Sequence, residues 1–164
     1  AFRYLFGARP AAVQRAIPQP DRQLLGSLPA DEFSAEATDR LRHMLHYNVL
    51  GGKLNRALTV FTAMKACLHP AQPTEQQIQD GLVLGWCMEL IQAAFLMADD
   101  VMDNSDLRRL KPSWHKEVGP MAINDAFIIE GIVYHMIRKY FRSRSWYIDV
   151  LEMIQKITLV TELG

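Results

Sequence analysis

The fold of this chain is decided by one stretch, Glu89–Arg109, which has the sequence ELIQAAFLMADDVMDNSDLRR. Three carboxylates, Asp99, Asp100 and Asp103, follow an apolar run, and two adjacent arginines end the stretch. Residues three or four apart on a helix share a face, so these carboxylates should point toward one patch of surface. There they repel one another and oppose the dipole of a helix C-terminus. A cation should therefore offset their charge.

Mg²⁺ is the expected cation, because it is held by one or two carboxylates while substrate phosphates and water complete its octahedral shell. An apolar segment, Ala93–Ala98, precedes the carboxylates, and the pair Arg108–Arg109 follows them. A metal-bridged diphosphate with a hydrophobic tail would need both. A calcium-binding EF-hand loop is excluded, because its alternating ligands and its turn glycine are missing from this stretch. A solvated acidic helix end is the alternative that the residues alone leave open.

A second cationic element lies upstream, in Tyr47–Val60, with the sequence YNVLGGKLNRALTV. Its glycine pair allows positive φ or a close approach of the backbone to a ligand. Lys53 and Arg56 follow, one helical turn apart, at a predicted helix start. Alone, this pattern is a weak phosphate-binding signal, and a pair of surface cations is the better interpretation.

Together these segments resemble the trans-isoprenyl diphosphate synthase family. The segment DDVMDNSDLRRLKPSW resembles the family's first aspartate-rich motif, and Tyr47–Val60 resembles its GGKxxR element. Gln92 lies seven residues before the first Asp, where farnesyl diphosphate synthases carry a Gln. The segments GWCMELIQ, AINDA and TELG match the eukaryotic farnesyl diphosphate synthase subgroup at further points. The resemblance covers about Asp31–Gly164 and corresponds to the N-terminal half of such an enzyme.

The resemblance implies a Mg²⁺-dependent prenyltransferase. Such an enzyme condenses isopentenyl diphosphate with an allylic diphosphate, dimethylallyl or geranyl, to make farnesyl diphosphate. By position, Asp99 and Asp103 would hold Mg²⁺ with Asp100 supporting them, and Arg108 would meet the allylic diphosphate. The residues that would meet isopentenyl diphosphate are Lys53, Arg56, Gln92 and Arg109.

The resemblance also implies where the hydrocarbon tail of the product ends. In the family, the residues four and five positions before the first Asp form the floor of the tail cavity. Here these residues are Phe95 and Ala94, whereas typical animal enzymes place aromatic residues at both positions. Thr161, in the TELG segment, is assigned to the same chain-length pocket. Ala94 would leave room for some C20 product, although an ordinary C15 product is the favoured expectation.

Helical periodicity predicts an all-α fold class, and the sequence has neither a strand pattern nor an internal repeat. Asp31 or Ser34 should cap the first helix and Thr74 the central one. The resemblance implies an antiparallel bundle of the isoprenoid-synthase type. The expected helices cover Asp31–Tyr47, Lys53–Leu68, Thr74–Asp99, Ile123–Phe141 and Trp146–Gly164. The pattern lapses between Asn104 and Pro120.

Composition excludes several other classes of protein. The 18 basic and 18 acidic residues balance to a formal charge of zero, which gives no sign of non-specific binding to nucleic acid or anionic lipid. No segment approaches the roughly 18 uninterrupted apolar residues of a membrane span. Cys67 and Cys87 lack metal or redox spacing and are expected to be buried in a reducing compartment. Trp114 and His115 are expected to pack rather than to catalyse.

The domain organisation is expected to have two parts. Residues 1–30 should form a flexible arm or a mitochondrial transit segment, because prolines interrupt them and their first acidic residue is Asp21. A cytoplasmic location is expected, with a mitochondrial one as the alternative. Residues 31–164 should form the N-terminal half of a synthase domain that is a homodimer at full length.

Two other functions stay open, because the family's second aspartate-rich motif is not found in this sequence. One is a catalytically silent truncated paralogue. The other is a non-catalytic partner subunit that modulates a full-length synthase. The retention of three mutually repelling carboxylates beside two arginines argues against a pure scaffold.

Overall fold

The structure is a computed structural model that describes residues 34–164. Within these residues it contains six helices and one pair of very short strands, so the predicted all-α class is confirmed. The helices are α4 (Ala35–Asn48), α5 (Asn55–Leu68), α6 (Glu75–Met102), α7 (Trp114–Val118), α8 (Met121–Phe141) and α9 (Tyr147–Leu163). The predicted arm or transit segment, residues 1–30, lies outside the described residues.

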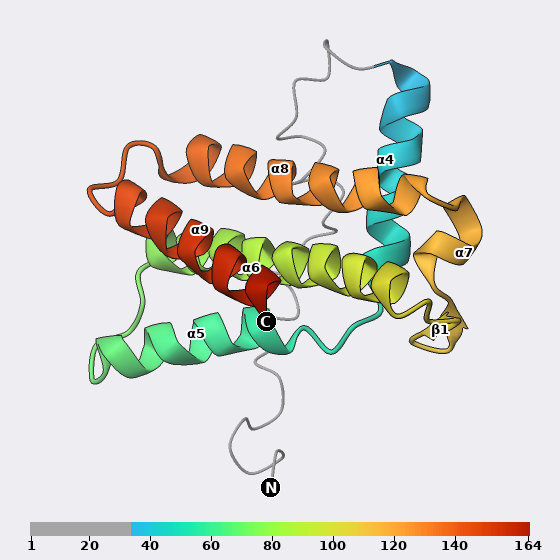
Figure 1. The fold of residues 1–164 in the computed structure, drawn as a ribbon. Helices are drawn as coiled ribbons and strands as arrows, with labels where there is room; N and C mark the ends of the chain where they lie inside the picture. Colours follow the sequence, from blue (N-terminus) through green and yellow to red (C-terminus); the bar gives the residue numbers. More distant parts are fainter. Residues whose placement is uncertain (1–33) are drawn as a thin grey trace, which may run out of the picture.

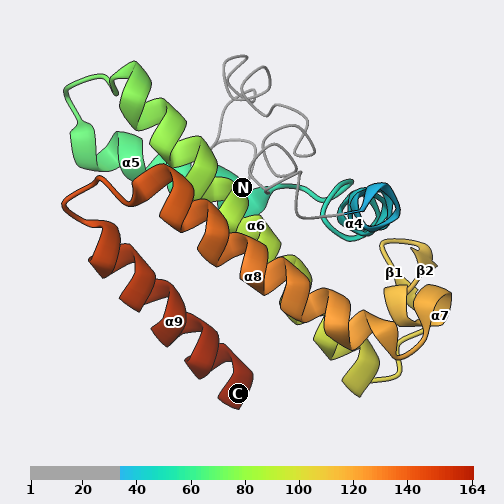
Figure 2. The same cartoon turned by 90° about the horizontal axis from the view of Figure 1, so that it is seen from above.

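The bundle is built around α6, as Figure 1 shows. Helix α8 lies along one side of α6 and α5 along another, while α9 lies beside α8 and α4 crosses the bundle steeply (Figures 1 and 2). Successive long helices from α5 onward run antiparallel, as short connections between packed helices require. The end of α6 that carries the aspartates therefore lies near the start of α8.

Helix α6 forms where the sequence predicts a central helix. Thr74 Oγ1 accepts a hydrogen bond from the backbone N–H of Gln77, and Gln77 Oε1 accepts one from the backbone N–H of Thr74, which is a capping box. The helix then continues to Met102, three residues beyond the predicted end. Its buried residues lie on several sides, because α5 and α8 cover different faces of it.

Gly85 allows α5 and α6 to approach each other closely. A Cβ atom at this glycine would lie 3.1 Å from Ala57 Cβ and 3.2 Å from Ala57 Cα. Small residues on both helices therefore bring the backbone of α5 against α6. This contact positions the start of α5, where Arg56 lies.

Helix α6 is also, within residues 34–164, the one helix long and apolar enough to cross a membrane by length and composition. However, 67% of its most apolar window is buried inside the protein. Core helices of globular proteins pass the same test, so this finding is weak support for a membrane segment. Its apolar surface is explained by its packing against α5 and α8.

The structure selects one of the two predicted caps of the first helix and corrects the predicted start of the second. Helix α4 begins after Ser34, whose Oγ accepts from the Ala37 N–H at 3.1 Å, so the predicted Ser34 cap is confirmed. The predicted start of the next helix at Lys53 was wrong, because α5 begins at Asn55. Leu54 has a φ of 51°, in the left-handed region, and this conformation separates Lys53 from the helix.

The prediction that the chain has no strands was wrong for the segment between α6 and α7. Strands β1 (Leu107–Arg108) and β2 (Lys111–Pro112) pair antiparallel. The two residues between them, Arg109 and Leu110, have φ values of 55° and 66°, as in a tight hairpin turn. Strands of two residues are too short to show an alternating pattern, which is why the sequence did not reveal them.

The packing role predicted for Trp114 is confirmed. Trp114 is 3% exposed, and its Nε1 donates to Asp125 Oδ2 at 2.8 Å. His115 is half-buried, and neither ring nitrogen has a hydrogen-bond partner within the described residues. The prediction for the cysteines was half right. Cys87 is fully buried, whereas Cys67 is exposed.

Candidate functional site

The three aspartates lie at the C-terminal end of α6, but their side chains differ in exposure. The Asp99 side chain is 51% exposed, whereas the Asp100 side chain is only 4% exposed. Asp103 is exposed and is the C-cap of α6, with its N–H donating to the Asp99 carbonyl at 2.8 Å. The helix therefore directs one carboxylate inward and leaves the other two toward solvent.

Arg108 neutralises part of this cluster. Its Nη2 donates to Asp100 Oδ1 at 2.5 Å and to Asp99 Oδ2 at 3.2 Å, and its Nε lies 3.0 Å from Asp100 Oδ2. The hydrogen bond to Asp100, with the charges of both aspartates, raises the pKa of the Arg108 guanidinium. Arg108 lies on strand β1, which places its side chain beside the end of α6. The arginine that the sequence assigned to an allylic diphosphate thus already contacts the predicted metal-binding carboxylates.

Arg109 connects the hairpin to the glycine loop. Its Nη1 donates to the carbonyl of Leu50 at 2.9 Å and to that of Asn48 at 3.3 Å. A Cβ atom at Gly52 would lie 3.0 Å from Arg109 Nη2, so Gly52 leaves room for the guanidinium. Gly51, with a φ of 81°, supplies the left-handed turn. The two cationic motifs predicted from the sequence, GGK and RR, therefore meet in space.

Arg56 is positioned through Glu89, a residue that the sequence analysis did not assign. Glu89 is 8% exposed, and its Oε1 accepts from the backbone N–H groups of Arg56 at 2.9 Å and Ala57 at 3.1 Å. Because Leu54 has no side-chain acceptor, this carboxylate from α6 caps the N-terminus of α5. Glu89 is the one acidic residue in the apolar run from Gly81 to Ala98, and this was the signal that could have identified it.

Lys53 is exposed in the loop before α5, Arg56 is exposed in the first turn of α5, and Gln92 is half-buried on α6. Gln92 lies three residues after Glu89, so the two side chains share the face of α6 that meets the start of α5. The predicted isopentenyl diphosphate residues are thus distributed over the glycine loop, α5, α6 and, for Arg109, the β1–β2 hairpin.

A small cavity of about 20 Å³ joins the end of α4, the C-terminal part of α6 and the hairpin. Asp100, Arg108 and Arg109 line it together with Lys111. Lys111 Nζ donates to the Tyr47 carbonyl at 3.1 Å and lies 4.4 Å from the centroid of the Tyr47 ring. The cavity brings together one aspartate and three cations of the aspartate-rich motif, beside Tyr47 and Asn48 of the GGKxxR element.

A pocket of about 90 Å³ lies where α6, α8 and α9 meet. Ala94 and Phe95, predicted to form the floor of the tail cavity, both line it. Thr161 is exposed on α9, while Thr158 and Glu162 of the same helix line the pocket. The complete lining is Ile91, Ala94, Phe95, Ala98, Ala126, Phe127, Glu130, Thr158 and Glu162.

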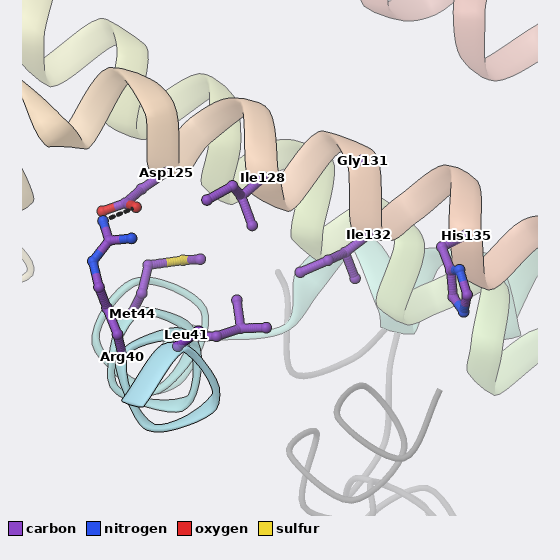
Figure 3. A pocket seen from close by; sticks show the side chains of 9 residues that line it. Arg40, Leu41, Met44, Asp125, Ile128, Gly131, Ile132 and His135 are labelled. Atoms are coloured by element: carbon purple, nitrogen blue, oxygen red, sulfur yellow. Dashed lines mark hydrogen bonds and ion pairs between the residues drawn. The ribbon is translucent and has the colours of Figure 1, made fainter. Parts of the chain in front are cut away.

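Another pocket, of about 340 Å³, lies between α4 and α8 (Figure 3). The ion pair of Arg40 with Asp125 lies at one end and His135 at the other, with apolar side chains such as Leu41 between them. It shares no lining residue with the cavity at the aspartates or with the pocket at Ala94.

Comparison with known proteins assigns the chain to a family. The sequence matches the model of the polyprenyl synthetase family over residues 38–164. This chain belongs to that family. It is 42% identical over 152 residues to the farnesyl pyrophosphate synthase of Saccharomyces cerevisiae, covering 90% of this chain and 43% of the yeast protein. It is 44% identical over 131 residues to that of Gallus gallus, covering 79% of this chain and 36% of the chicken protein.

Solved polyprenyl synthetase structures agree with the fold. The farnesyl diphosphate synthase of T. brucei superposes with a TM-score of 0.81 at 30% identity, over 94% of this chain and 44% of that one. The same enzyme complexed with risedronate gives the same TM-score and identity, over 43% of its length. The chain thus spans about two fifths of the length of these relatives. The family resemblance found in the sequence is confirmed, as is the expected isoprenoid-synthase fold.

The described residues match the predicted Mg²⁺ site only in part. Within residues 34–164, no three His, Cys, Asp or Glu side chains are grouped as metal ligands, and Asp100 is turned toward Arg108. Asp99, which contacts Arg108 at 3.2 Å but has a 51% exposed side chain, and the exposed Asp103 lie one helical turn apart. Two carboxylates, with diphosphate oxygens and water as the other ligands, are a donor set that Mg²⁺ accepts. The donors present therefore fit a metal that is bound together with substrate.

Proposed function

We propose that this chain takes part in a prenyl transfer in which isopentenyl diphosphate is condensed with an allylic diphosphate to give farnesyl diphosphate. The observation that carries the proposal is the contact of Arg108 with both Asp99 and Asp100 at the end of α6. This contact occurs in a polyprenyl synthetase chain that is about 40% identical to several eukaryotic farnesyl pyrophosphate synthases. Mg²⁺ and both diphosphate substrates are part of the proposal.

The allylic substrate would bind with its diphosphate at the end of α6. Asp99 and Asp103 would hold Mg²⁺, which when bound supplies positive charge against the diphosphate leaving group. Arg108 lies beside these carboxylates and can donate N–H groups to the same diphosphate. Asp100, buried under Arg108, orients the guanidinium and balances its charge.

Isopentenyl diphosphate would bind at the glycine loop. Lys53 and Arg56 are exposed there, and Arg109 holds the loop through the carbonyls of Asn48 and Leu50. Gln92 lies on the adjoining face of α6. In the reaction, the C–O bond of the allylic substrate breaks with its electron pair on the diphosphate. The double bond of isopentenyl diphosphate then attacks the allylic carbon, and loss of a proton leaves a chain five carbons longer.

Solved relatives support the choice of ligand. Structures of the T. brucei farnesyl diphosphate synthase have been determined in complex with risedronate and with minodronate. These are bisphosphonates, whose two linked phosphonate groups imitate a diphosphate in shape and charge. The same chemistry would suit Asp99, Asp103 and Arg108 of this chain.

The proposal is tested by incorporation of labelled isopentenyl diphosphate into product. The protein, at its full natural length, is incubated with geranyl diphosphate and Mg²⁺, and the products are separated by chromatography. Asp103→Asn should lower the rate at least ~100-fold, because electrostatic contacts to developing charge each contribute a few kcal/mol. Asp106→Asn is the matched control, since Asp106 has an 85% exposed side chain that pairs with Lys116 at 3.0 Å.

Each outcome of this assay has a definite meaning. A wild-type protein that binds the diphosphates without forming product would support the silent-paralogue alternative and contradict the proposal. An Asp103→Asn protein with near-normal turnover would exclude the metal role of that carboxylate. We also propose a homodimer, which sedimentation analysis of the full-length protein would test, while the cellular location stays a prediction.

A further inference from the structure

The pocket at Ala94 is bounded at its inner end by polar groups that the sequence analysis did not consider. Ile91 and Ala98 line it from α6, and their separation of seven residues corresponds to about 10 Å along the helix. Ala98 directly precedes the aspartates, so Ile91 marks the inner end. The volume of about 90 Å³ is smaller than the ~150 Å³ cavity that can hold one benzene ring. The pocket therefore has room for the end of a hydrocarbon tail, and not for all of it.

Glu130 is one of two carboxylates on the wall of this mostly apolar pocket; the other, Glu162 of α9, is exposed to solvent. Glu130 lies on α8 between Ile129, which is fully buried, and Gly131, and it is itself half-buried. The neighbouring lining residues of α8, Ala126 and Phe127, lie one turn or less before it, toward the aspartates. Because α8 runs antiparallel to α6, Glu130 lies deeper along the pocket than these two residues.

Tyr134 holds this carboxylate in place. Its hydroxyl donates to Glu130 Oε1 at 3.2 Å, across one turn of α8. Burial, followed by the charge of Glu130, raises the pKa of Tyr134, so the phenol remains a donor at neutral pH. Thr158, which is buried and also lines the pocket, lies close to the same phenol.

We propose that Glu130, anchored by Tyr134, ends the tail pocket by its polarity and so sets the longest prenyl chain that this protein accepts. The inference rests on the proposed function and adds a specificity residue to it. A tail that reached Glu130 would remove water from the carboxylate, and uncompensated burial of a charge is strongly unfavourable. Volume at Ala94 alone would then not admit a longer product, because the added methyl groups would meet a charged wall.

The experiment measures binding, so it does not depend on turnover. Isothermal titration calorimetry with Mg²⁺ compares geranyl, farnesyl and geranylgeranyl diphosphates on the full-length protein. Wild type should bind farnesyl diphosphate at least about tenfold more tightly than geranylgeranyl diphosphate. Glu130→Leu should bring this ratio of dissociation constants close to one. Glu130→Gln, which keeps the shape and removes the charge, and Tyr134→Phe, which removes the anchoring hydrogen bond, should each give a smaller decrease.

Glu152→Leu is the control, because Glu152 is exposed on α9 and does not line the pocket. It makes the same change of charge and should leave the ratio at its wild-type value. The inference would be overturned if the ratio of dissociation constants were unchanged in Glu130→Leu and Glu130→Gln. It would also be overturned if the wild-type protein bound farnesyl and geranylgeranyl diphosphates equally, or bound neither. Chain-length discrimination without incorporation of isopentenyl diphosphate would instead overturn the proposed function alone.

Discussion

The Glu89 carboxylate accepts a hydrogen bond from the backbone N–H of Arg56 at 2.9 Å, although the two residues lie on different helices. The same oxygen also accepts from the next N–H of α5. A side chain from the middle of α6 thus replaces the N-cap that Leu54 cannot provide. The contact fixes the start of α5, with its predicted diphosphate ligand, on the helix that carries the aspartates.

Glu89→Ala should lower the free energy of unfolding by about 1–3 kcal/mol, because two backbone donors lose their acceptor in a buried position. Glu89→Gln should lower it less, since the amide oxygen still accepts a hydrogen bond. Urea denaturation of both variants measures the effect. Glu152→Ala, a change at an exposed glutamate, should stay within about 0.5 kcal/mol of wild type. Equal stabilities of Glu89→Ala and wild type would show that this cap is unimportant.

Gly85→Ala should destabilise the protein by about 1–3 kcal/mol, because the added methyl group would lie 3.1 Å from Ala57 Cβ and push α5 away from α6. The matched control is Gly131→Ala on α8, where a Cβ atom meets no atom within 4 Å. That change should be neutral or stabilising by up to about 1 kcal/mol, through helix propensity. In thermal unfolding, the melting temperature should therefore fall in Gly85→Ala and stay unchanged or rise in Gly131→Ala.

The two cysteines should react very differently with a thiol reagent. Cys67 is exposed, whereas Cys87 is fully buried and burial raises the pKa of its thiol to about 12. At pH 8 Cys87 is therefore protonated as well as inaccessible, and the thiolate is the reactive form. Titration with Ellman's reagent should find one reactive thiol in the native protein and two in urea. Rapid labelling of Cys87 without denaturant would contradict the packing described for α6.

Ala94→Phe tests whether position 94 controls product length. Ala94 lines the pocket and is 7% exposed, so a phenyl ring there would occupy space at the tail's end. If Ala94 opens the floor, the parent enzyme should release some C20 product, and the variant should shift toward C15 or C10. Product chromatography on the full-length protein measures the distribution. Identical products from the two proteins would show that another group, such as Glu130, sets the limit.

Much of the fold could be predicted because its signals are local. The central helix begins at Thr74 through a capping box, and the apolar periodicity that follows is continuous. Ser34 likewise caps α4 with its own side chain. The hairpin of Leu107–Pro112 and the start of α5 were missed, since positive φ at Leu54 or Arg109 leaves no pattern in residue type.

The sequence by itself determined the all-α class, the family and the chemical groups of the candidate site. Helical periodicity and the order of charged residues can be read directly from the sequence. Only the tertiary structure decided how those groups pair. It turns Asp100 toward Arg108, places Arg109 against Gly52, and brings Glu89 to the start of α5. Each of these contacts joins separate elements of the fold. Such contacts depend on how helices and turns pack against each other, and residue spacing along one helix does not contain that information.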